Sequence, residues 1–424
     1  MSAVNTQNPS NVTAARISID DHQIDESKIC PRAINIIKKL HAADYEAYLV
    51  GGCVRDLILN IVPKDFDVVT NARPEQICKI FSNSRLIGRR FRLVHVYSQR
   101  SYIEVSTFRA IADANRQTHT QEDNNGRIVR DNTYGNMEED ALRRDFSINA
   151  LYYDLSTSEV IDFCHGMEDL HNKQIRMIGE VFTRYKEDPV RMLRAVRFKS
   201  KLSLTLTEET AEPINTLGGL LRDIPPARLF DEMVKLFHSG SAVKCFNALK
   251  EYNLLHILFP YTAHHLENDE QFMQLIYAAL ANTDRRIITG KSVNPAFIFA
   301  ILLWRPYQSL LDEYMSRDQP VSELVWAAAR TTVNNQSSMT FIPKRLAIVI
   351  CEIWRLQHRF TQRKNRRTLK ILNHPRFRAA YDFFCLRTEA GEIDSNECTW
   401  WTQIQNADDE QKQHMIQTKK PHSI

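Results

Sequence analysis

The spacing of apolar residues changes along the chain and divides it into a mixed part and a helical part. Apolar residues recur at helical spacing over residues 31–41, behind a proline that suits a first helical turn. Beyond them, short apolar runs typical of strands alternate with short helical patterns. The expected strands cover residues 48–50, 66–69, 92–97 and 102–108, and the expected helices cover residues 54–59 and 74–81. This alternation predicts an α/β or α+β domain.

Strand signals fade beyond about Gly166, and the remaining sequence predicts one helix after another. Prolines interrupt the helical patterns and mark the expected breaks between helices. These breaks fall at residues 224–226, 259–260, 294–295, 342–343 and 374–375. The expected fold class is therefore α+β, with a small mixed α/β head followed by an all-helical remainder.

The composition is that of an ordinary soluble globular protein, with 43% hydrophobic and 25% charged residues. Residues 1–28 contain few large apolar side chains and predict a disordered segment, without the apolar core of a signal peptide. The longest strongly apolar run, Pro295–Trp304, is about half as long as a helix that spans a bilayer. We therefore expect a cytoplasmic protein with no membrane span.

The eight cysteines lie far apart in the chain and form no C-x-x-C pair. Closely spaced cysteines are typical of zinc sites and of small disulfide-rich proteins. We therefore expect buried, reduced thiols rather than a disulfide or zinc framework.

The first candidate for chemistry is Asp65-Phe66-Asp67, at the start of an expected strand. Alternate side chains of a strand project from one face, so the two carboxylates would lie side by side. Their burial would be costly unless a cation lay between them, and carboxylate oxygens are ligands that Mg²⁺ prefers. Carboxylates on surfaces and in turns share this short pattern, so the motifs before and after it must decide whether it binds metal. Glu104, on an expected strand, is either a third carboxylate of this site or an exposed strand residue.

The pair Gly51-Gly52 follows an apolar run and precedes an expected helix, which predicts a tight turn between strand and helix. Backbone N–H groups and the helix N-terminus at such a turn can receive a triphosphate, and Arg55 can add a charged contact. The alternative is an ordinary glycine turn with a solvated arginine. The Asp-x-Asp pattern a few residues downstream favours phosphate binding.

A double arginine occurs in the segment Arg143-Arg144-Asp145-Phe146-Ser147-Ile148-Asn149. The arginines would bind phosphates, while Asp145 and Asn149 would hydrogen-bond to ribose hydroxyls. The alternative is a solvated helix with i,i+4 charge pairs.

A second arginine segment contains Asp188, Arg191 and Arg194, which form one polar stripe if residues 187–198 are helical. A paired Asp and Arg can present an acceptor and a planar donor fork to the edge of a base. The alternative is a salt-bridged helix face.

The formal charge of the whole chain is only +4, so a surface that binds nucleic acid requires local segregation of charge. Residues 341–378 supply it, with eleven Lys and Arg against one acidic residue. Such a segment can hold RNA phosphates in a salt-sensitive way that is indifferent to sequence. The aromatic residues interleaved with these charges can stack on bases, but aromatics at helical spacing are more often core residues. They are Trp354, Phe360, Phe377 and Tyr381.

In their order along the chain, these segments resemble the class II tRNA nucleotidyltransferases and the bacterial poly(A) polymerases. The resemblance rests on Gly51–Asp56, Asp65–Asp67, Arg143–Asn149 and Glu187–Arg191. Further segments resemble the bacterial poly(A) polymerases in particular, namely Gly88–Val96, Ile224–Phe230, Asn294–Phe297 and His374–Ala380. The likeness runs from about residue 46 to residue 387.

The resemblance implies a nucleotidyltransferase head followed by helical neck, body and leg regions. With the disordered segment at 1–28, the implied division is a catalytic, metal-binding head at 29–165, a base-recognising neck at 166–240, an RNA-binding body at 241–390 and a tail at 391–424. It also implies metal binding by Asp65, Asp67 and, as a third carboxylate, Glu104, with Asp65, Asp67 and Asp145 as catalytic residues. Nucleotide contacts are implied for Gly51, Gly52, Arg55, Arg143, Arg144, Asn149, Asp188, Arg191 and Arg194, with Asp188 and Arg191 reading the base.

The implied activity is the template-independent addition of AMP from ATP to RNA 3′ ends, with two Mg²⁺ ions or Mn²⁺, in RNA processing and decay. The expected partners are RNA 3′ ends, ATP and RNA-decay proteins, and we expect a monomer. The nearest alternative is a CCA-adding tRNA nucleotidyltransferase with the same head chemistry, and the segments in the helical part favour poly(A) addition. An alternative of another class is a non-catalytic RNA-binding protein with an inherited head, which the intact carboxylates disfavour.

Two features depart from the family pattern. Cys53 replaces the smaller residue that is usual after the glycine pair, and we expect little effect because its side chain is small. The chain stops at Lys419–Ile424 without the long Arg-rich tail common in this group. RNA affinity or partner binding supplied by such a tail is therefore in question.

Overall fold

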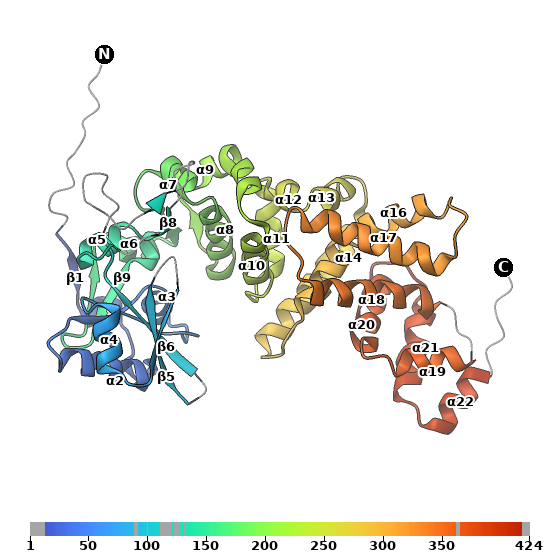
Figure 1. Ribbon diagram of the computed structural model, residues 1–424, viewed down its shortest axis with the longest axis horizontal. Coiled ribbons are helices and arrows are strands. Elements are labelled where there is room, and N and C mark those ends of the chain that lie inside the picture. The colour runs from blue at the N-terminus through green and yellow to red at the C-terminus, as the bar shows by residue number, and fades with distance from the viewer. Residues whose placement is uncertain are drawn as a thin grey trace, which may run out of the picture. The chain divides into compact units, whose positions relative to one another are not determined.

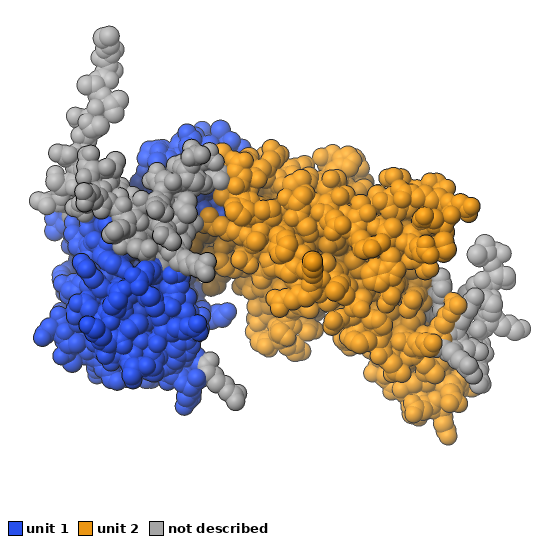
Figure 2. Space-filling view, viewed as in Figure 1, with its two compact units in different colours: residues 1–191, 203–217 blue, residues 192–202, 218–424 orange. Residues whose placement is uncertain are grey.

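The computed structural model describes residues 13–88, 92–99, 101–110, 121–122, 128–130, 133–361 and 365–417. The chain divides into two compact units (Figure 2). Unit 1 contains residues 1–191 and 203–217, and unit 2 contains residues 192–202 and 218–424. The first boundary falls within helix α8 (Val190–Leu202), and the chain then returns to unit 1 after Leu202 and enters unit 2 again after Leu217.

An eight-stranded sheet forms the centre of unit 1 (Figure 1). Its strand order is β1-β10-β9-β2-β3-β6-β5-β4, and only the β3–β6 pair is parallel. The expected strands are confirmed within one or two residues at each end. The sheet strands are β1 (Ala15–Ile17), β2 (Ala47–Val50), β3 (Asp67–Thr70), β4 (Ser84–Ile87), β5 (Leu93–Ser98), β6 (Ser101–Thr107), β9 (Leu151–Asp154) and β10 (Glu159–Asp162).

Several of the helices in unit 1 pack on this sheet. Helix α2 spans Pro31–His41, as the apolar spacing predicts, and buries Ile36, Ile37 and Leu40 while packing on β2 and β3. Helix α4 contacts β4, β5 and β6. The other helices are α1 (Ile19–His22), η1 (Glu26–Lys28), α3 (Gly52–Ile58), α4 (Pro74–Ile80), α5 (Met137–Leu142), η2 (Ser147–Asn149), α6 (Gly166–His171), α7 (Val181–Glu187) and α9 (Glu208–Leu217).

The prediction of disorder over residues 1–28 is wrong for residues 13–28. Strand β1 pairs antiparallel with β10, and α1 and η1 follow it directly. His22 is buried, and its Nε2 atom lies 3.0 Å from the carbonyl oxygen of Ser158. Backbone hydrogen bonds to a sheet edge stabilise β1, and a count of apolar side chains does not detect them. Residues 1–12 lie outside the described part of the chain.

Unit 2 is helical, as the sequence predicts. Beyond Gly166, the strands in the described part of the chain are the short parallel pair β11 (Gln174–Ile175) and β12 (Thr205–Leu206), and both lie in unit 1. The expected proline breaks are confirmed, since α10, α13 and α15 each begin at a proline and α18 begins directly after one. Among the described residues, no helix is long and apolar enough to cross a membrane.

The helices of unit 2 that follow α8 cover most of residues 218–417. They are η3 (Gly218–Asp223), α10 (Pro226–Phe237), α11 (Ala242–Glu251), α12 (Leu254–Leu258), α13 (Pro260–Leu266), α14 (Glu270–Ile288), α15 (Pro295–Leu302), α16 (Trp304–Tyr314), α17 (Val321–Ser337), α18 (Lys344–Phe360), α19 (Asn365–Leu372), α20 (Phe377–Glu389), α21 (Ser395–Asn406) and α22 (Asp409–Gln417). Outside unit 2, β7 (Gln121–Glu122) and β8 (Ile128–Arg130) form a separate two-stranded sheet.

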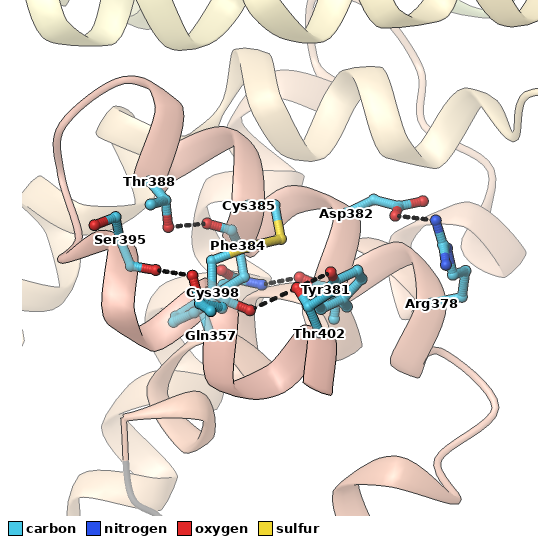
Figure 3. The surroundings of a disulfide bond; sticks show 12 residues. Gln357, Arg378, Tyr381, Asp382, Phe384, Cys385, Thr388, Ser395, Cys398 and Thr402 are labelled. Carbon is cyan, nitrogen blue, oxygen red and sulfur yellow. Dashed lines mark hydrogen bonds and ion pairs between the residues drawn. A yellow bond between two sulfur atoms is a disulfide. The ribbon is translucent and has the colours of Figure 1, made fainter. Parts of the chain in front are cut away.

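The expectation that all cysteines are reduced is wrong for one pair. Cys385 on α20 and Cys398 on α21 form a disulfide, with 5.5 Å between their Cα atoms (Figure 3). The hydroxyl groups of Tyr381 and Thr402, 2.6 Å apart, join the same two helices. Packing of α20 on α21 brings the two thiols together, so the spacing of cysteines in the sequence gives no sign of the bond.

Candidate active site

The carboxylates predicted to bind metal lie at the start of β3 and on its neighbour β6. Asp67 is the first residue of β3, whereas Asp65 lies in the bend before it, so strand alternation does not place both side chains as expected. The parallel register instead sets Glu104 directly beside Asp67. Burial and the charges of Glu104 and Asp65 raise the pKa of Asp67 to about 6, although Arg144 acts to lower it. These negative charges are therefore close enough to repel one another.

Glu104 has a second neighbour that the sequence reasoning did not identify. The antiparallel register of β5 and β6 places His95 opposite Glu104, and His95 Nε2 lies 3.3 Å from Glu104 Oε1. The imidazole stacks on Tyr102, with ring centroids 3.8 Å apart. A signal for this contact existed, because two expected strands joined by a short turn pair in a predictable register. The histidine therefore orients the carboxylate that lies beside Asp67.

The glycine pair forms the predicted turn between β2 and α3. Gly51 has a φ of 76°, a conformation that favours glycine, and its N–H donates to the carbonyl of Leu151 at 3.0 Å. A Cβ atom at Gly51 would lie 3.2 Å from Arg144 Nη1. At Gly52 it would lie 3.6 Å from Arg55 Nη2, an ordinary contact distance. The turn therefore needs glycine at position 51, and it lies against an arginine of the double-arginine segment.

Arg55 and Asn149, predicted as nucleotide contacts, are both hydrogen-bonded within the protein. Arg55 is buried, and its Nε and Nη2 atoms donate to Asp56 Oδ1 at 2.9 and 2.6 Å. Its Nη1 donates to Asn149 Oδ1, and Asn149 Nδ2 donates to Asp145 Oδ1 at 3.2 Å. A chain of hydrogen bonds thus ties helix α3 to the segment that carries Asp145. Direct contact of Arg55 or Asn149 with a nucleotide stays a prediction.

Arg144 is held by a buried acid and a buried phenol. Its Nε and Nη2 atoms donate to Asp140 Oδ2 at 3.2 and 2.9 Å, and the hydroxyl of Tyr152 donates to the same oxygen at 2.9 Å. Burial alone would raise the pKa of Asp140, but the charges of Arg144 and Arg109 outweigh it and lower that pKa. The pair has the i,i+4 spacing of a surface helix pair, yet Asp140 is only 3% exposed. The guanidinium of Arg144, which pairs with Asp140, is therefore a fixed cation beside Gly51.

The sequence reasoning also missed Arg184, which fixes the backbone of the double-arginine segment. Its Nη2 donates to the carbonyl oxygens of Arg143 and Arg144 at 2.6 and 2.5 Å. Burial and the charge of Arg191 lower the pKa of Arg184 to about 10, against the opposing effect of Glu187. Arg184 lies outside the motifs that carry the family resemblance, and no spacing in the sequence marks it. Arg143 itself donates from Nη1 to the carbonyl of Ala110 at 3.3 Å.

Asp188 does not share a helix with Arg191 and Arg194, so the prediction of a single helical stripe is wrong. Helix α7 ends at Glu187 and α8 begins at Val190. The cause is Pro189, because the residue before a proline is disfavoured in helical conformation. Asp188 Oδ1 accepts a hydrogen bond from the N–H of Val190, the first residue of α8, at 3.3 Å.

On α8, Arg191 and Arg194 lie one helical turn apart. The Nη1 atom of Arg191 donates to Glu187 Oε2 at 2.8 Å and to the carbonyl of Arg184 at 2.6 Å. The guanidinium of Arg194 lies 5.9 Å from the ring centre of Phe198. Base recognition by these residues stays a prediction.

In the part of the chain that the structure describes, no three His, Cys, Asp or Glu side chains are gathered into a ready-made metal site. Mg²⁺ is commonly held by one or two carboxylates together with substrate phosphates rather than by a complete protein cage. The oxygen donors of Asp65, Asp67 and Glu104 match that kind of site.

Three family models match the chain. Residues 47–176 match the "Poly A polymerase head domain", and residues 203–266 match the "Probable RNA and SrmB-binding site of polymerase A". Residues 317–423 match the "Polymerase A arginine-rich C-terminus". This last match lies within unit 2.

Individual relatives differ in how much of the chain they match. "Poly(A) polymerase I" of Salmonella typhi is 44% identical over 93% of this chain and 86% of its own length. A "CCA-adding enzyme" of Lactobacillus helveticus is 38% identical over 51% of this chain and 52% of its own length. The solved Thermotoga maritima CCA-adding enzyme complexed with tRNA shares the fold, with a TM-score of 0.61 and 15% identity over 96% of this chain and 91% of that chain.

The raised pKa of Asp67 predicts a pH-dependent loss of stability in metal-free protein. Its folded pKa of about 6 exceeds the ordinary value of 3.8, so at intermediate pH only the unfolded state has released the proton. The free energy of unfolding should therefore fall by about 3 kcal/mol as pH rises from roughly 4 to roughly 6. Thermal unfolding of wild type and Asp67→Asn in EDTA measures this fall. An identical pH dependence in both proteins would contradict the raised pKa.

The two glycines of the turn offer a matched pair of substitutions. Gly51→Ala places a side chain at positive φ and 3.2 Å from Arg144, whereas Gly52→Ala meets only ordinary contacts. We expect Gly51→Ala to cost about 1–2 kcal/mol of stability and to raise the KM for nucleotide. Gly52→Ala should leave stability nearly unchanged. Chemical denaturation and initial rates measure both effects, and equal losses would exclude the special role of position 51.

Proposed function

Since this chain belongs to the bacterial poly(A) polymerase I family, we propose that it adds AMP from ATP to RNA 3′ ends without a template. The chain is a nucleotidyltransferase that acts on RNA. The observation that carries adenylate addition is the 44% identity to a poly(A) polymerase I over 93% of the chain. The CCA-adding enzyme of Lactobacillus helveticus matches only about half of the chain, which favours poly(A) addition over the nearest alternative.

We assign the transfer to the region of the sheet that carries Asp65, Asp67 and Glu104. Burial and repulsion make ionised Asp67 costly, and a divalent cation would relieve that cost, so these oxygen donors fit Mg²⁺ or Mn²⁺. When bound, two such ions would activate the RNA 3′-hydroxyl and neutralise charge on the reacting phosphate. His95 orients Glu104 for this role through its 3.3 Å contact.

The turn at Gly51-Gly52 and the guanidinium of Arg144 form the proposed triphosphate site. Arg144 lies against Gly51 and its charge is fixed by Asp140, so it meets a phosphate without losing side-chain freedom. In the reaction, the RNA 3′-hydroxyl releases its proton to solvent as its oxygen bonds to the α-phosphorus, the bond from that phosphorus to the α,β-bridging oxygen breaks, and pyrophosphate leaves. Positioning and charge neutralisation do most of the work.

The remaining predicted residues take supporting or base-reading roles in this proposal. Arg55 and Asn149 hold Asp145 through the hydrogen bonds described above. Asp188 and Arg191 read the base, and Arg194 extends the same polar surface one turn along α8. In this proposal, residues 29–165 carry out catalysis, residues 166–240 recognise the base and residues 241–390 bind RNA.

Primer extension with each nucleotide supplied separately tests the activity. We expect ATP and a divalent cation to support long extension of a single-stranded RNA primer. Asp67→Ala should reduce the rate by about a thousandfold or more while RNA affinity is kept. Retained polymerisation by that variant would refute the metal-site assignment.

The same assay separates the alternatives. Addition of C, C and A to truncated tRNA, followed by arrest, would establish the CCA-adding activity instead. Absence of incorporation with any nucleotide would leave a non-catalytic RNA-binding protein.

We also propose that the added tails promote RNA decay and bring RNA-decay proteins to the substrate. An unstructured 3′ tail gives an exonuclease a single strand to grip, which a base-paired 3′ end does not. Deletion of the gene should lengthen the half-lives of structured RNAs, as measured after transcription is stopped. Unchanged half-lives would exclude this role.

A further inference from the structure

Two of the four aromatic residues in the basic segment 341–378 are not available to bases. Trp354 and Phe360 are completely buried in the helical core, and Tyr381, just beyond the segment, is 7% exposed. A ring from outside the segment meets one of its basic side chains. It is Trp326 on α17, which is half-buried, and the guanidinium of Arg355 lies 5.1 Å from its centre.

A cavity of about 610 Å³ lies where α17, α18 and α19 meet within unit 2. Its cationic lining residues are Arg355 and Arg359 of α18 and Arg367 and Lys370 of α19. No Asp or Glu is among the residues that line it. The volume is in the range of small-ligand sites, and a single nucleotide fits it.

Among the described residues, no acid forms an ion pair that would neutralise the positive charge of this cavity. None of its four cations forms an ion pair with a residue that the structure describes. Burial and the charges of Arg355 and Arg367 lower the pKa of Arg359, which is the effect of cations held together without an acid. Arg355 also has a buried Nε with no hydrogen-bond partner. An anion would relieve both costs.

Neighbouring arginines of the same segment behave differently. Arg376 pairs with Glu352 at 3.2 Å, and Arg378 pairs with Asp382 at 3.0 Å. His358 also lines the cavity, but its pKa is lowered to about 4, mainly by burial, so it adds no charge at neutral pH. Within the described part of the chain, the four cations of the cavity therefore lack the acidic partners that Arg376 and Arg378 have.

The lining is also divided by chemistry. Helix α17 contributes Trp326 together with Val321, Ser322 and Val325, and no charged group. The cations all come from the other two helices. An aromatic surface faces bases of any sequence, while arginine and lysine hold the phosphate. This combination distinguishes a nucleotide of single-stranded nucleic acid from an acidic peptide, which has no base to stack.

We propose that this cavity binds one nucleotide of the single-stranded RNA substrate, with the base on Trp326 and the phosphate between Arg359, Arg367 and Lys370. The inference rests on the proposed function, which makes RNA the substrate. It adds a site in the helical unit that holds RNA by its backbone and by a stacked base, without reading sequence.

RNA binding by full-length protein tests the cationic part of the site. Binding is measured with a fluorescent oligo(A) on the Asp67→Ala background, so that the primer is not extended. Arg359→Glu should weaken binding about tenfold and make it less dependent on salt. The matched control is Arg345→Glu, because Arg345 is exposed on the same helix, roughly 15 Å along its axis from Arg355, and does not line the cavity. Equal losses in both variants would overturn the site.

Stacking on Trp326 is tested separately. Trp326→Ala should weaken oligo(A) binding about tenfold, whereas Trp326→Phe keeps a ring and should keep most of the affinity. Oligonucleotides carrying 5-iodouridine should crosslink to the peptide that contains Trp326, as identified by mass spectrometry. Crosslinking confined to other peptides would overturn the assignment. Displacement of RNA from the site by ATP or inorganic phosphate at equal concentration would identify a free-anion site instead.

Extension assays keep the two proposals apart. In the otherwise wild-type chain, Arg359→Glu should raise the KM for RNA and leave kcat and the KM for ATP unchanged. If the wild-type chain extends RNA and Arg359→Glu has the same KM for RNA as Arg345→Glu, the proposed cavity site is refuted and the proposed function stands. A wild-type chain that incorporates no nucleotide defeats the proposed function, whatever the crosslinks show.

Discussion

The head of this protein is built around a carboxylate that its own fold makes costly to ionise. Asp67 begins a strand whose parallel neighbour places Glu104 beside it, and burial removes much of the water that would otherwise screen the two charges. The nearest compensation within the protein is Arg144, whose charge acts to lower the raised pKa of Asp67. That compensation is incomplete, so a cation at the proposed metal site would relieve the repulsion that remains. A fully neutralised pair would have no affinity left for a metal.

The residues around Arg144 that hold its guanidinium in place add no further positive charge beside Asp67. Asp140 and Tyr152 hold the guanidinium of Arg144, and Arg184 holds the backbone carbonyl of the same residue. Removing freedom from a charged group before the substrate arrives lowers the entropy that binding must overcome. The same logic applies on the other side of Asp67, where His95 restrains Glu104. Arg144 and Glu104 in the head therefore each have a partner that limits the motion of their side chain.

Features that follow from local sequence were predictable, and features that follow from tertiary pairing were not. Helix α2 and the proline-initiated helices of unit 2 follow from apolar spacing and from the fixed φ of proline. The glycine turn and the carboxylate motif were also recognisable, because the family resemblance concerns short segments. Arg184 and the disulfide between Cys385 and Cys398 depend on packing between separate elements. The contact between Trp326 and Arg355 was not predictable for the same reason, since Trp326 lies outside the basic segment.

The pairing of β1 with β10 also sets an order for folding. Residues 15–17 find their partners only at residues 160–162, so the sheet cannot close this edge until almost the whole head exists. At a synthesis rate of roughly 5–20 residues per second, the first strand waits about ten seconds or longer on the ribosome for its partner. During that interval the backbone N–H and C=O groups of residues 15–17 have no strand to pair with. The strand made first is thus placed only after β10, and its docking completes this edge of the sheet.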